Sequence, residues 1–244
     1  MPSMKRQRHV ALAFFRTRAC ALVLWPTLLL VGLPSSARAQ DEHDPHHRRP
    51  EDTRSYLDHL DRPERAKEQK PADVVAALAL KPGMSVADIG AGSGFFTRRF
   101  VEAVTESGTV YAVDIEPEML QYTKESIEHL HVPFTAEFIL AAPDNPKLPT
   151  ASVDLIFLCN TYHHLEDRAA YFARVRSALK PGGRIAIIDF YHDERSGNVG
   201  FPRRHLVPQD TVIAEMGRAG YRLLKEHTFL DRQYFLEFGQ EKNS

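Results

Sequence analysis

The feature that most constrains this chain is the stretch at residues 86–95, which reads VADIGAGSGF. A short apolar run carries an acid, Asp88, and is followed by glycines at every second position: Gly90, Gly92 and Gly94. Apolar residues then recur at helical spacing, which predicts a helix over 95–104. Glycines permit a sharp turn and a close approach of a ligand to the backbone, and a helix N-terminus presents free N–H groups. The stretch therefore predicts a strand, a ligand-binding turn and a helix.

The spacing of the glycines and the positions of two acids limit the classes of ligand that could bind at this turn. A dinucleotide turn has the spacing G-x-G-x-x-G, but here Phe95 stands where its third glycine would be. Asp88 would be awkward beside a pyrophosphate, yet it suits a ligand that carries an ammonium group. Asp114 closes the next apolar run, twenty residues beyond Gly94, and an acid there can accept both hydroxyls of a ribose. A cationic amino-acid end plus a ribose describes S-adenosylmethionine (SAM).

Two later segments extend the pattern. Residues 148–156 contain a Leu-Pro pair before an apolar strand, and residues 179–184 read LKPGGR, a turn before another strand. With the glycine turn and Asp114, and in this order, they resemble the class I SAM-dependent methyltransferases over residues 70–240. The similarity is greatest to the subgroup that includes the ubiquinone- and menaquinone-biosynthesis methyltransferases. This resemblance implies a three-layer, Rossmann-like, doubly wound α/β fold, with a seven-stranded sheet that is mostly parallel and has one antiparallel strand.

The hydrophobic pattern independently predicts strands that alternate with helices, which indicates a parallel sheet covered on both faces. We expect helices at 95–104, 117–130, 166–179 and 211–218, and strands at 84–89, 109–113, 137–140, 154–158, 184–188, 222–228 and 233–238. The last two strands have no helix between them, which predicts the antiparallel strand. Ligands of such sheets bind beyond the carboxyl ends of the strands. The resemblance accordingly implies these SAM-binding residues: Asp88, Gly90, Ala91, Gly92, Gly94, Asp114, Ile115, Ala141, Ala142 and Asn160.

Candidate catalytic residues follow the fourth strand, where the acceptor faces the donor methyl group in this architecture. His163 is either a general base or a structural residue that orients the next helix, and His164 is a second candidate. A further group of polar side chains could contact substrate, although a solvated loop face is the favoured interpretation: Tyr191, His192, Arg195, Arg203, Arg204 and His205. No metal site is predicted, since the histidines at 43–47 lack a second ligand cluster and are typical of a spacer.

Three functions are compatible with these features. The first is a SAM-dependent methyltransferase for a small-molecule acceptor. The second is a catalytically silent domain that binds SAM or a nucleoside, because no catalytic residue is unambiguous. The third is a nicotinamide-dependent oxidoreductase, which Phe95 and Asp88 oppose.

The first 39 residues have the pattern of a signal peptide. A basic start precedes an apolar run at 19–33, which is short of the roughly 20 residues of a spanning helix, and Ala37-Arg38-Ala39 forms a small-x-small cleavage pattern before Gln40. A transit peptide is the alternative, but the leucine run favours export, periplasmic or secreted. No stable membrane span is expected after cleavage.

The rest of the chain divides into a polar linker and N-terminal helical segment at 40–70 and a methyltransferase domain at 71–240. The helical segment either packs over the SAM pocket or forms a surface helix pair. Without the signal peptide, 25 Lys and Arg face 32 Asp and Glu, and such an acidic body argues against a nucleic-acid partner. Cys159 would be the only remaining cysteine, so no internal disulfide is expected.

Overall fold

The computed structural model of the chain describes residues 53–200 and 202–241, all of which belong to one compact unit. The predicted signal peptide and residues 40–52 of the predicted linker lie outside the described residues. No helix within the described part of the chain has both the length and the apolar content needed to cross a membrane.

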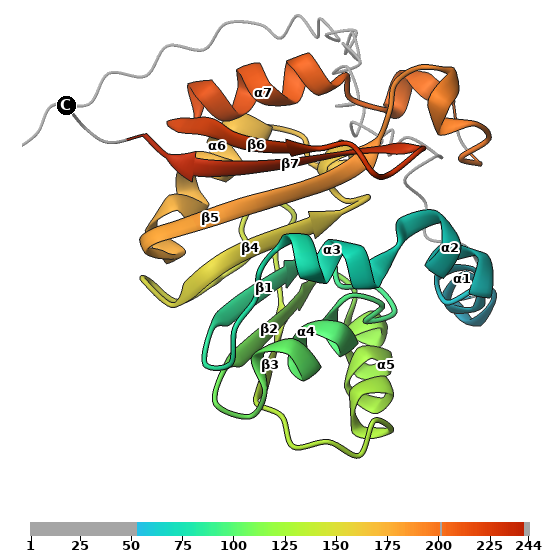
Figure 1. The fold of residues 1–244 in the computed structure, drawn as a ribbon, viewed down its shortest axis with the longest axis vertical. Coiled ribbons are helices and arrows are strands. Elements are labelled where there is room, and N and C mark those ends of the chain that lie inside the picture. Colours follow the sequence, from blue (N-terminus) through green and yellow to red (C-terminus); the bar gives the residue numbers. More distant parts are fainter. Residues whose placement is uncertain (1–52, 201, 242–244) are drawn as a thin grey trace, which may run out of the picture. The chain divides into compact units, whose positions relative to one another are not determined.

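A seven-stranded sheet forms the centre of the domain, in the order β3-β2-β1-β4-β5-β7-β6 (Figure 1). Its strands are β1 (Ser85–Ile89), β2 (Thr109–Asp114), β3 (Ala136–Leu140), β4 (Val153–Cys159), β5 (Leu179–Phe190), β6 (Tyr221–His227) and β7 (Gln233–Gln240). Strands β1 to β5 pair in parallel, and β7 lies antiparallel between β5 and β6. The predicted fold class and its single antiparallel strand are therefore confirmed.

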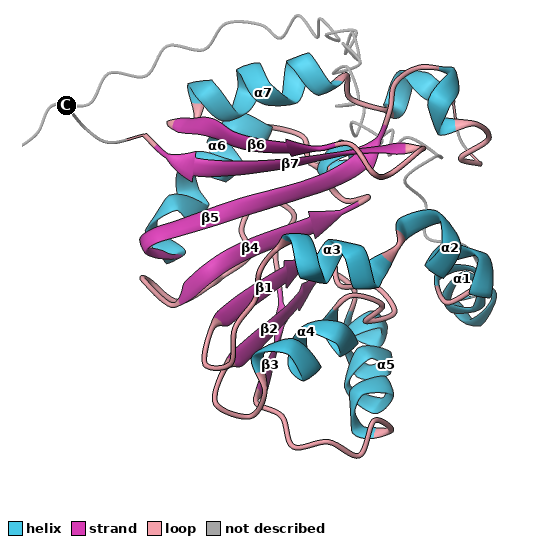
Figure 2. Ribbon diagram, in the orientation of Figure 1, coloured by secondary structure: helices cyan, strands magenta, loops and turns pink. Residues whose placement is uncertain are grey.

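Helices cover both faces of the sheet, which gives the three layers (Figure 2). They are α1 (Thr53–Leu60), α2 (Pro63–Gln69), α3 (Pro71–Ala77), α4 (Thr97–Val104), α5 (Pro117–Glu128), α6 (Arg168–Val175) and α7 (Gln209–Arg218). One core lies between the sheet and α3, α4 and α5, with Phe100 and Ile127 fully buried in it. The other core holds Phe172 of α6 and Met216 of α7. Strands buried on both sides explain the nearly continuous apolar runs in the sequence.

The order of the strands reverses at β1. β1 pairs with β2 on one side and with β4 on the other, so the chain runs outward from β1 in one direction through β2 and β3 and then returns to β4 on the other side of β1. A crevice forms at the carboxyl ends of strands at such a switch point, where doubly wound sheets bind ligands. The fold therefore brings the glycine turn and the segment after β4 to the same edge.

Most predicted elements agree with the observed ones to within about two residues, but two of them differ by more. The helix expected at 166–179 is shorter, because Asp167 lies at its N-cap and accepts a hydrogen bond from the Ala170 N–H, and the last turn is a 3-10 helix, Arg176–Ala178. The strand expected at 184–188 instead begins at Leu179. Its register against β4 shifts between Val153 and Leu155, so the residues around Gly182 form an irregularity at the start of β5 rather than a separate turn.

Candidate functional site

The glycine turn after β1 has a backbone that requires its glycines. Gly90, Gly92 and Gly94 have φ angles of 74°, 57° and 75°, in the left-handed region that side chains disfavour. A Cβ atom on Gly90 would clash with Thr161 Oγ1, and one on Gly94 would lie 2.9 Å from Thr123 Cγ2. The turn therefore packs against the segment that follows β4 on one side and against α5 on the other.

Asp114, the last residue of β2, is bonded directly to this turn. Its Oδ2 accepts a hydrogen bond from the Gly92 N–H at 2.8 Å, and its Oδ1 accepts one from the Glu116 N–H at 3.1 Å. Burial raises the pKa of Asp114, while these backbone hydrogen bonds oppose the rise. Each carboxylate oxygen retains a lone pair for another donor. The geometry suits a ligand that offers two hydroxyl groups.

Asp88 lies deeper, under the turn. It is 3% exposed, and Thr97 Oγ1 donates a hydrogen bond to its Oδ2 at 2.6 Å. Burial raises its pKa to about 6, although the Thr97 hydrogen bond and the positive charge of Arg65 oppose the shift. A carboxylate held away from water in this way is stabilised by a cation, because its charge is poorly solvated.

The other predicted cofactor residues lie around the same edge. The Ala141 N–H donates to the Asp114 backbone oxygen at 2.9 Å, which joins the ends of β2 and β3. Ile115 is 53% exposed, and Leu140, which was not predicted, is 48% exposed. Ala91 is buried in the turn and Ala142 follows β3. The strand ends therefore present apolar side chains to solvent beside a carboxylate.

Asn160 follows β4 with a φ of 55°. Its backbone N–H donates to the Ile188 oxygen at 2.9 Å, and its Oδ1 accepts from Gln233 Nε2 at 2.6 Å. The side chain is thus engaged with the first residue of β7. Asn160 lies at the carboxyl end of β4, where the site was predicted, but its side-chain oxygen is already hydrogen-bonded to Gln233.

His163 forms a pair with an aspartate that was not among the predicted site residues. Its Nδ1 lies 2.8 and 3.0 Å from the two carboxylate oxygens of Asp189, and its backbone N–H donates to Asp189 Oδ2 at 3.1 Å. Both side chains are buried. A carboxylate at Nδ1 fixes the orientation of the ring and, with the proton on Nδ1, makes Nε2 the basic nitrogen. The sequence carried a signal for Asp189, since it follows the apolar run of β5 at the same edge.

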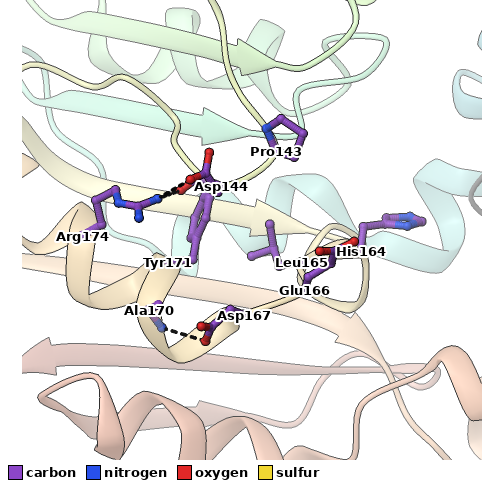
Figure 3. Close-up of a pocket in the computed structure, with 9 residues that line it drawn as sticks. All are labelled: Pro143, Asp144, His164, Leu165, Glu166, Asp167, Ala170, Tyr171 and Arg174. Carbon is purple, nitrogen blue, oxygen red and sulfur yellow. Dashed lines mark hydrogen bonds and ion pairs between the residues drawn. The ribbon is translucent and has the colours of Figure 1, made fainter. Parts of the chain in front are cut away.

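His164 points elsewhere. It is exposed, with its ring centroid 4.1 Å from that of His163, and it lines a pocket of about 270 Å³ between the loops after β3 and β4 (Figure 3). The other lining residues are Pro143, Asp144, Leu165, Glu166, Asp167, Ala170, Tyr171 and Arg174. Arg174 and Asp144 form an ion pair at 3.0 Å across this pocket. Pro143, which directly follows Ala142, lines this pocket, but none of the predicted SAM-binding residues do.

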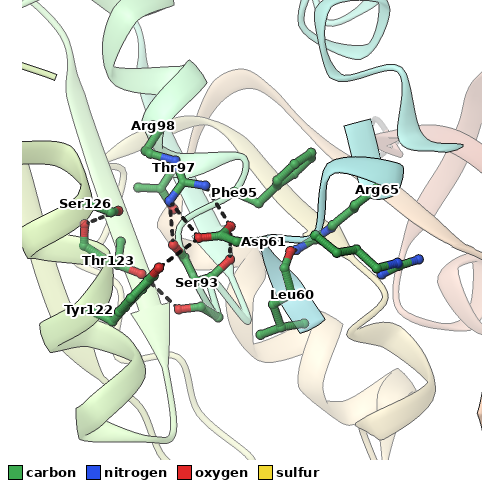
Figure 4. A network of polar contacts seen from close by, with 12 residues as sticks. Leu60, Asp61, Arg65, Ser93, Phe95, Thr97, Arg98, Tyr122, Thr123 and Ser126 are labelled. Carbon is green, nitrogen blue, oxygen red and sulfur yellow. Dashed lines mark hydrogen bonds and ion pairs between the residues drawn. The ribbon is translucent and has the colours of Figure 1, made fainter. Parts of the chain in front are cut away.

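The N-terminal helices are attached to the glycine turn through Asp61, which lies between α1 and α2 (Figure 4). Its Oδ1 accepts hydrogen bonds from Ser93 Oγ and Arg98 Nη2, both at 2.8 Å, and its Oδ2 accepts one from the Tyr122 hydroxyl at 3.1 Å. Leu60 lies beside Gly92, 3.3 Å from where a Cβ would be. Of the two alternatives for this segment, the structure supports packing over the turn.

Tyr56 of α1 extends this cover towards Asp114. Burial raises the pKa of Tyr56, and the negative charge of Asp114 raises it further. Nothing in the sequence pattern identified Tyr56 or Asp61 as neighbours of the turn, because they precede Gly90 by 34 and 29 residues.

Two of the candidate arginines in the loop after β5 pair with acids of the same loop. Arg195 pairs with Asp193 at 2.7 Å and stacks on Tyr191, with its guanidinium carbon 3.5 Å from the ring centroid. Arg203 lies 3.4 Å from Glu194. His192 and Arg204 are exposed, and His205 is half-buried. This arrangement favours the solvated-loop interpretation over direct contact with substrate.

Comparisons with known proteins agree on one family. The sequence model of a methyltransferase domain matches residues 86–183. The chain is 28% identical over 116 residues to a ubiquinone/menaquinone biosynthesis C-methyltransferase, UbiE, of Shewanella piezotolerans, covering 48% of this chain and 46% of that protein. The UbiE of Pseudoalteromonas translucida is 25% identical over 155 residues, with 62% of each chain covered. The chain thus spans about half to two-thirds of the length of these curated relatives.

A solved structure is similar over almost its whole length. The crystal structure of a SAM-dependent methyltransferase from Aquifex aeolicus has a TM-score of 0.70 and 29% identity, and the match covers 77% of this chain and 97% of that one. These findings confirm the resemblance predicted from the sequence, and with it SAM as the methyl donor of this class. They do not favour the nicotinamide-dependent or catalytically silent alternatives.

Proposed function

We propose that this chain, a class I SAM-dependent methyltransferase by fold and sequence similarity, transfers a methyl group from SAM to a small-molecule acceptor. The observation that carries this proposal is the Asp114 carboxylate, which is fixed by the Gly92 N–H beside a turn of three positive-φ glycines. An acid in that position can accept the two hydroxyls of a ribose.

The residues present fit SAM in charge and in hydrogen-bonding capacity. Asp114 would hold the ribose, and the backbone of the turn would hold the methionine end, with the buried Asp88 carboxylate supplying negative charge near its ammonium. The exposed Ile115 and Leu140 side chains would cover the faces of the adenine ring. Pro143 and Asp144, which follow β3, line the neighbouring pocket, and this pocket would offer further space for a ligand near the carboxyl ends of the strands.

When bound, SAM supplies a methyl group that is already activated. The protein then has to align the acceptor and exclude water from the site. The helices α1 and α2 would serve the second purpose, because Asp61 and Leu60 hold them against the glycine turn. SAM affinity would then depend on these contacts of the N-terminal helices.

His163 would act on the acceptor as a general base. Asp189 holds the ring through Nδ1, so Nε2 would take the proton from a hydroxyl, amine or acidic carbon. Histidine is the side chain that most often serves as a general base in enzymes. The structural alternative for His163 is that the same pair only secures the segment between β4 and α6.

The acceptor class rests on two observations. The matched relatives named UbiE act, by their names, on small molecules through C-methylation, and this supports a small-molecule acceptor here. The acidic composition of the chain after residue 39 disfavours nucleic acid.

The experiment that tests the function is an acceptor scan. The full chain is incubated with SAM and a panel of phenols, quinols, thiols and amines, and S-adenosylhomocysteine is quantified. We expect release above background with at least one acceptor, and loss of that release in Asp114→Ala. Binding of SAM without release with any acceptor of the panel would instead support the catalytically silent domain.

Export by an N-terminal signal peptide is part of this proposal. It is supported by the basic start, the apolar run at 19–33 and the Ala37-Arg38-Ala39 pattern. We expect mass spectrometry of the protein from its native host to find a new N-terminus at Gln40. An intact Met1 start in the soluble cytosolic fraction would contradict it.

A further inference from the structure

Tyr171 of α6 has a hydroxyl group that forms no hydrogen bond within the described part of the chain. The residue is only 5% exposed, and its ring is directed from α6 towards Asp144 (Figure 3). Tyr221, which is buried in the same core, differs, because its hydroxyl donates a hydrogen bond to the Phe172 backbone oxygen at 2.9 Å. A buried hydroxyl without a partner costs free energy. The Tyr171 hydroxyl would therefore be stabilised by a ligand that offers it a hydrogen bond.

This hydroxyl belongs to a residue that lines the pocket between α6 and the loop after β3. The pocket has a volume of about 270 Å³, which is near the lower end of the range for small-molecule sites. Pro143, Leu165 and Ala170 contribute apolar surface to its walls. The pocket can therefore accept a small ligand with an apolar body and a polar group that reaches Tyr171.

The charges around the pocket are mostly negative. Three acids and one arginine line it: Asp144, Glu166, Asp167 and Arg174. Arg174 already pairs with Asp144 at 3.0 Å, whereas Glu166 forms no hydrogen bond or ion pair with any residue that the structure describes. Burial raises the pKa of Tyr171, and the negative charge of Asp144 raises it further. The pocket therefore has an excess of negative charge, which a cationic ligand would complement.

The cation that fits this arrangement is organic. Among residues 53–200 and 202–241, no group of three or more His, Cys, Asp and Glu side chains could hold a metal ion. The acids of the pocket therefore do not converge on one point, as the ligands of a metal would. An ammonium group on an apolar body matches both the carboxylates and the apolar walls, and its N–H groups can donate to the Tyr171 oxygen.

The pocket also lies apart from the glycine turn. Tyr171 packs in the core with α6 and α7, whereas Phe95, directly after Gly94, packs in the other core. We propose that this pocket is a second ligand site, which binds a small organic cation through the Tyr171 hydroxyl and the Glu166 carboxylate. The proposal goes beyond the proposed function and does not depend on it.

The experiment uses three probes of similar size that differ in charge: phenethylammonium, phenethyl alcohol and phenylacetate. Each is titrated into the full chain near neutral pH and followed by saturation-transfer difference NMR, with and without S-adenosylhomocysteine. We expect the wild type to bind the cation roughly tenfold more tightly than the alcohol, which is the scale of the difference between a charge-assisted and a neutral hydrogen bond. Phenylacetate should bind most weakly. Binding of the cation should persist in the presence of S-adenosylhomocysteine.

Three variants identify the groups that bind the cation. Tyr171→Phe removes only the hydroxyl, so it should weaken binding of the cation by roughly tenfold without lowering Tm, because no hydrogen bond of the protein is lost. Tyr221→Phe is the matched control: it removes the hydrogen bond to Phe172, so it should lower Tm and leave binding of the cation unchanged. Glu166→Gln removes one negative charge at an exposed position and should reduce the preference for the cation over the alcohol.

The results that would overturn the proposal are distinct. A wild type that binds no probe, or binds all three equally, excludes a cation site. Displacement of the cation by S-adenosylhomocysteine would make the pocket part of the SAM site and overturn the proposal of a second site. Full affinity for the cation, or a lower Tm, in Tyr171→Phe would contradict the role of the hydroxyl.

Two further outcomes are covered by the same design. If Tyr171→Phe does not fold, Glu166→Gln tests the site in its place, and an unchanged preference for the cation in that variant overturns the proposal. A wild type that does not bind S-adenosylhomocysteine contradicts the proposed function alone, since the titrations without this compound still test the pocket.

Discussion

Replacing Asp61 with asparagine should destabilise the protein, because Asp61 joins the N-terminal helices to the glycine turn. The side chain accepts hydrogen bonds from Ser93, Arg98 and Tyr122, and the Asp61 and Arg98 side chains are only 22% and 18% exposed. Asparagine keeps the shape and one acceptor oxygen, but it removes the charge and turns an amide N–H₂ towards these donors.

The size of the effect follows from this burial. Hydrogen bonds to a charged group contribute roughly 1.5–3 kcal/mol each when buried, and a partly exposed ion pair contributes less. For three contacts at intermediate burial, with one partly retained, we expect a loss of about 2 kcal/mol. In a domain of this size that corresponds to a decrease in Tm of about 4–8 °C.

The loss should depend on pH. Burial raises the pKa of Asp61, but the hydrogen bonds from Arg98, Ser93 and Tyr122 outweigh it and hold this pKa below the ordinary value of 3.8. A depressed pKa in the folded state means that the carboxylate stabilises the fold above pH 3.8 and loses this contribution as the pH falls through the folded-state pKa. The difference in Tm between wild type and Asp61→Asn should therefore be full at pH 7 and shrink below pH 3.8.

The assay is thermal unfolding followed by circular dichroism, with Asp193→Asn as the control. Asp193 also pairs with an arginine at 2.7 Å, but both side chains are at least half exposed, so its replacement should leave Tm unchanged. A double-mutant cycle with Arg98→Gln isolates the ion pair. An Asp61→Asn protein that melts within about 1 °C of wild type at pH 7 would refute the reasoning.

Other predictions concern the site itself. His163→Gln should lower kcat by roughly 10²–10⁴-fold with SAM affinity retained if His163 is the base, and Asp189→Asn should shift the pH profile of kcat; parallel losses of Tm, SAM affinity and activity would indicate the structural role. Asp114→Ala should weaken SAM by roughly 1–3 kcal/mol, and calorimetry showing unchanged affinity would remove Asp114 from the site. Burial raises the pKa of Asp88 from 3.8 to about 6, so stability is lost as the pH rises from 3.8 through about 6; Asp88→Asn should raise the Tm of the ligand-free protein more at pH 8 than at pH 4, and equal effects at both would contradict this.

The parts of the fold that the sequence predicted are those encoded locally. The periodicity of each strand and helix, the positive-φ glycines of the turn and the right-handed connections between parallel strands are sufficient to place Asp114 beside Gly92. The mostly parallel, seven-stranded sheet and its one antiparallel strand followed from the same rules and from the family resemblance, whereas the order of the strands was not predicted.

Such local patterns do not predict contacts between segments that are far apart in the sequence. Asp61 meets Ser93 and Arg98, and Arg65 meets Phe95, only because α1 and α2 fold back over the turn, and no spacing in the sequence specifies that path. The His163–Asp189 pair joins residues that follow β4 and end β5. Its members could be placed at one edge of the sheet, but their direct contact depends on side-chain packing.

The central claim is that the crevice at the glycine turn binds SAM, and calorimetric titration of the full chain tests it most directly. The account predicts saturable binding of SAM at a single site and of S-adenosylhomocysteine at the same site, clear weakening of both in Asp114→Ala, and no binding of NAD under the same conditions. A protein that is folded by circular dichroism and gives no binding heat with SAM at several temperatures, or that binds NAD instead, would contradict it.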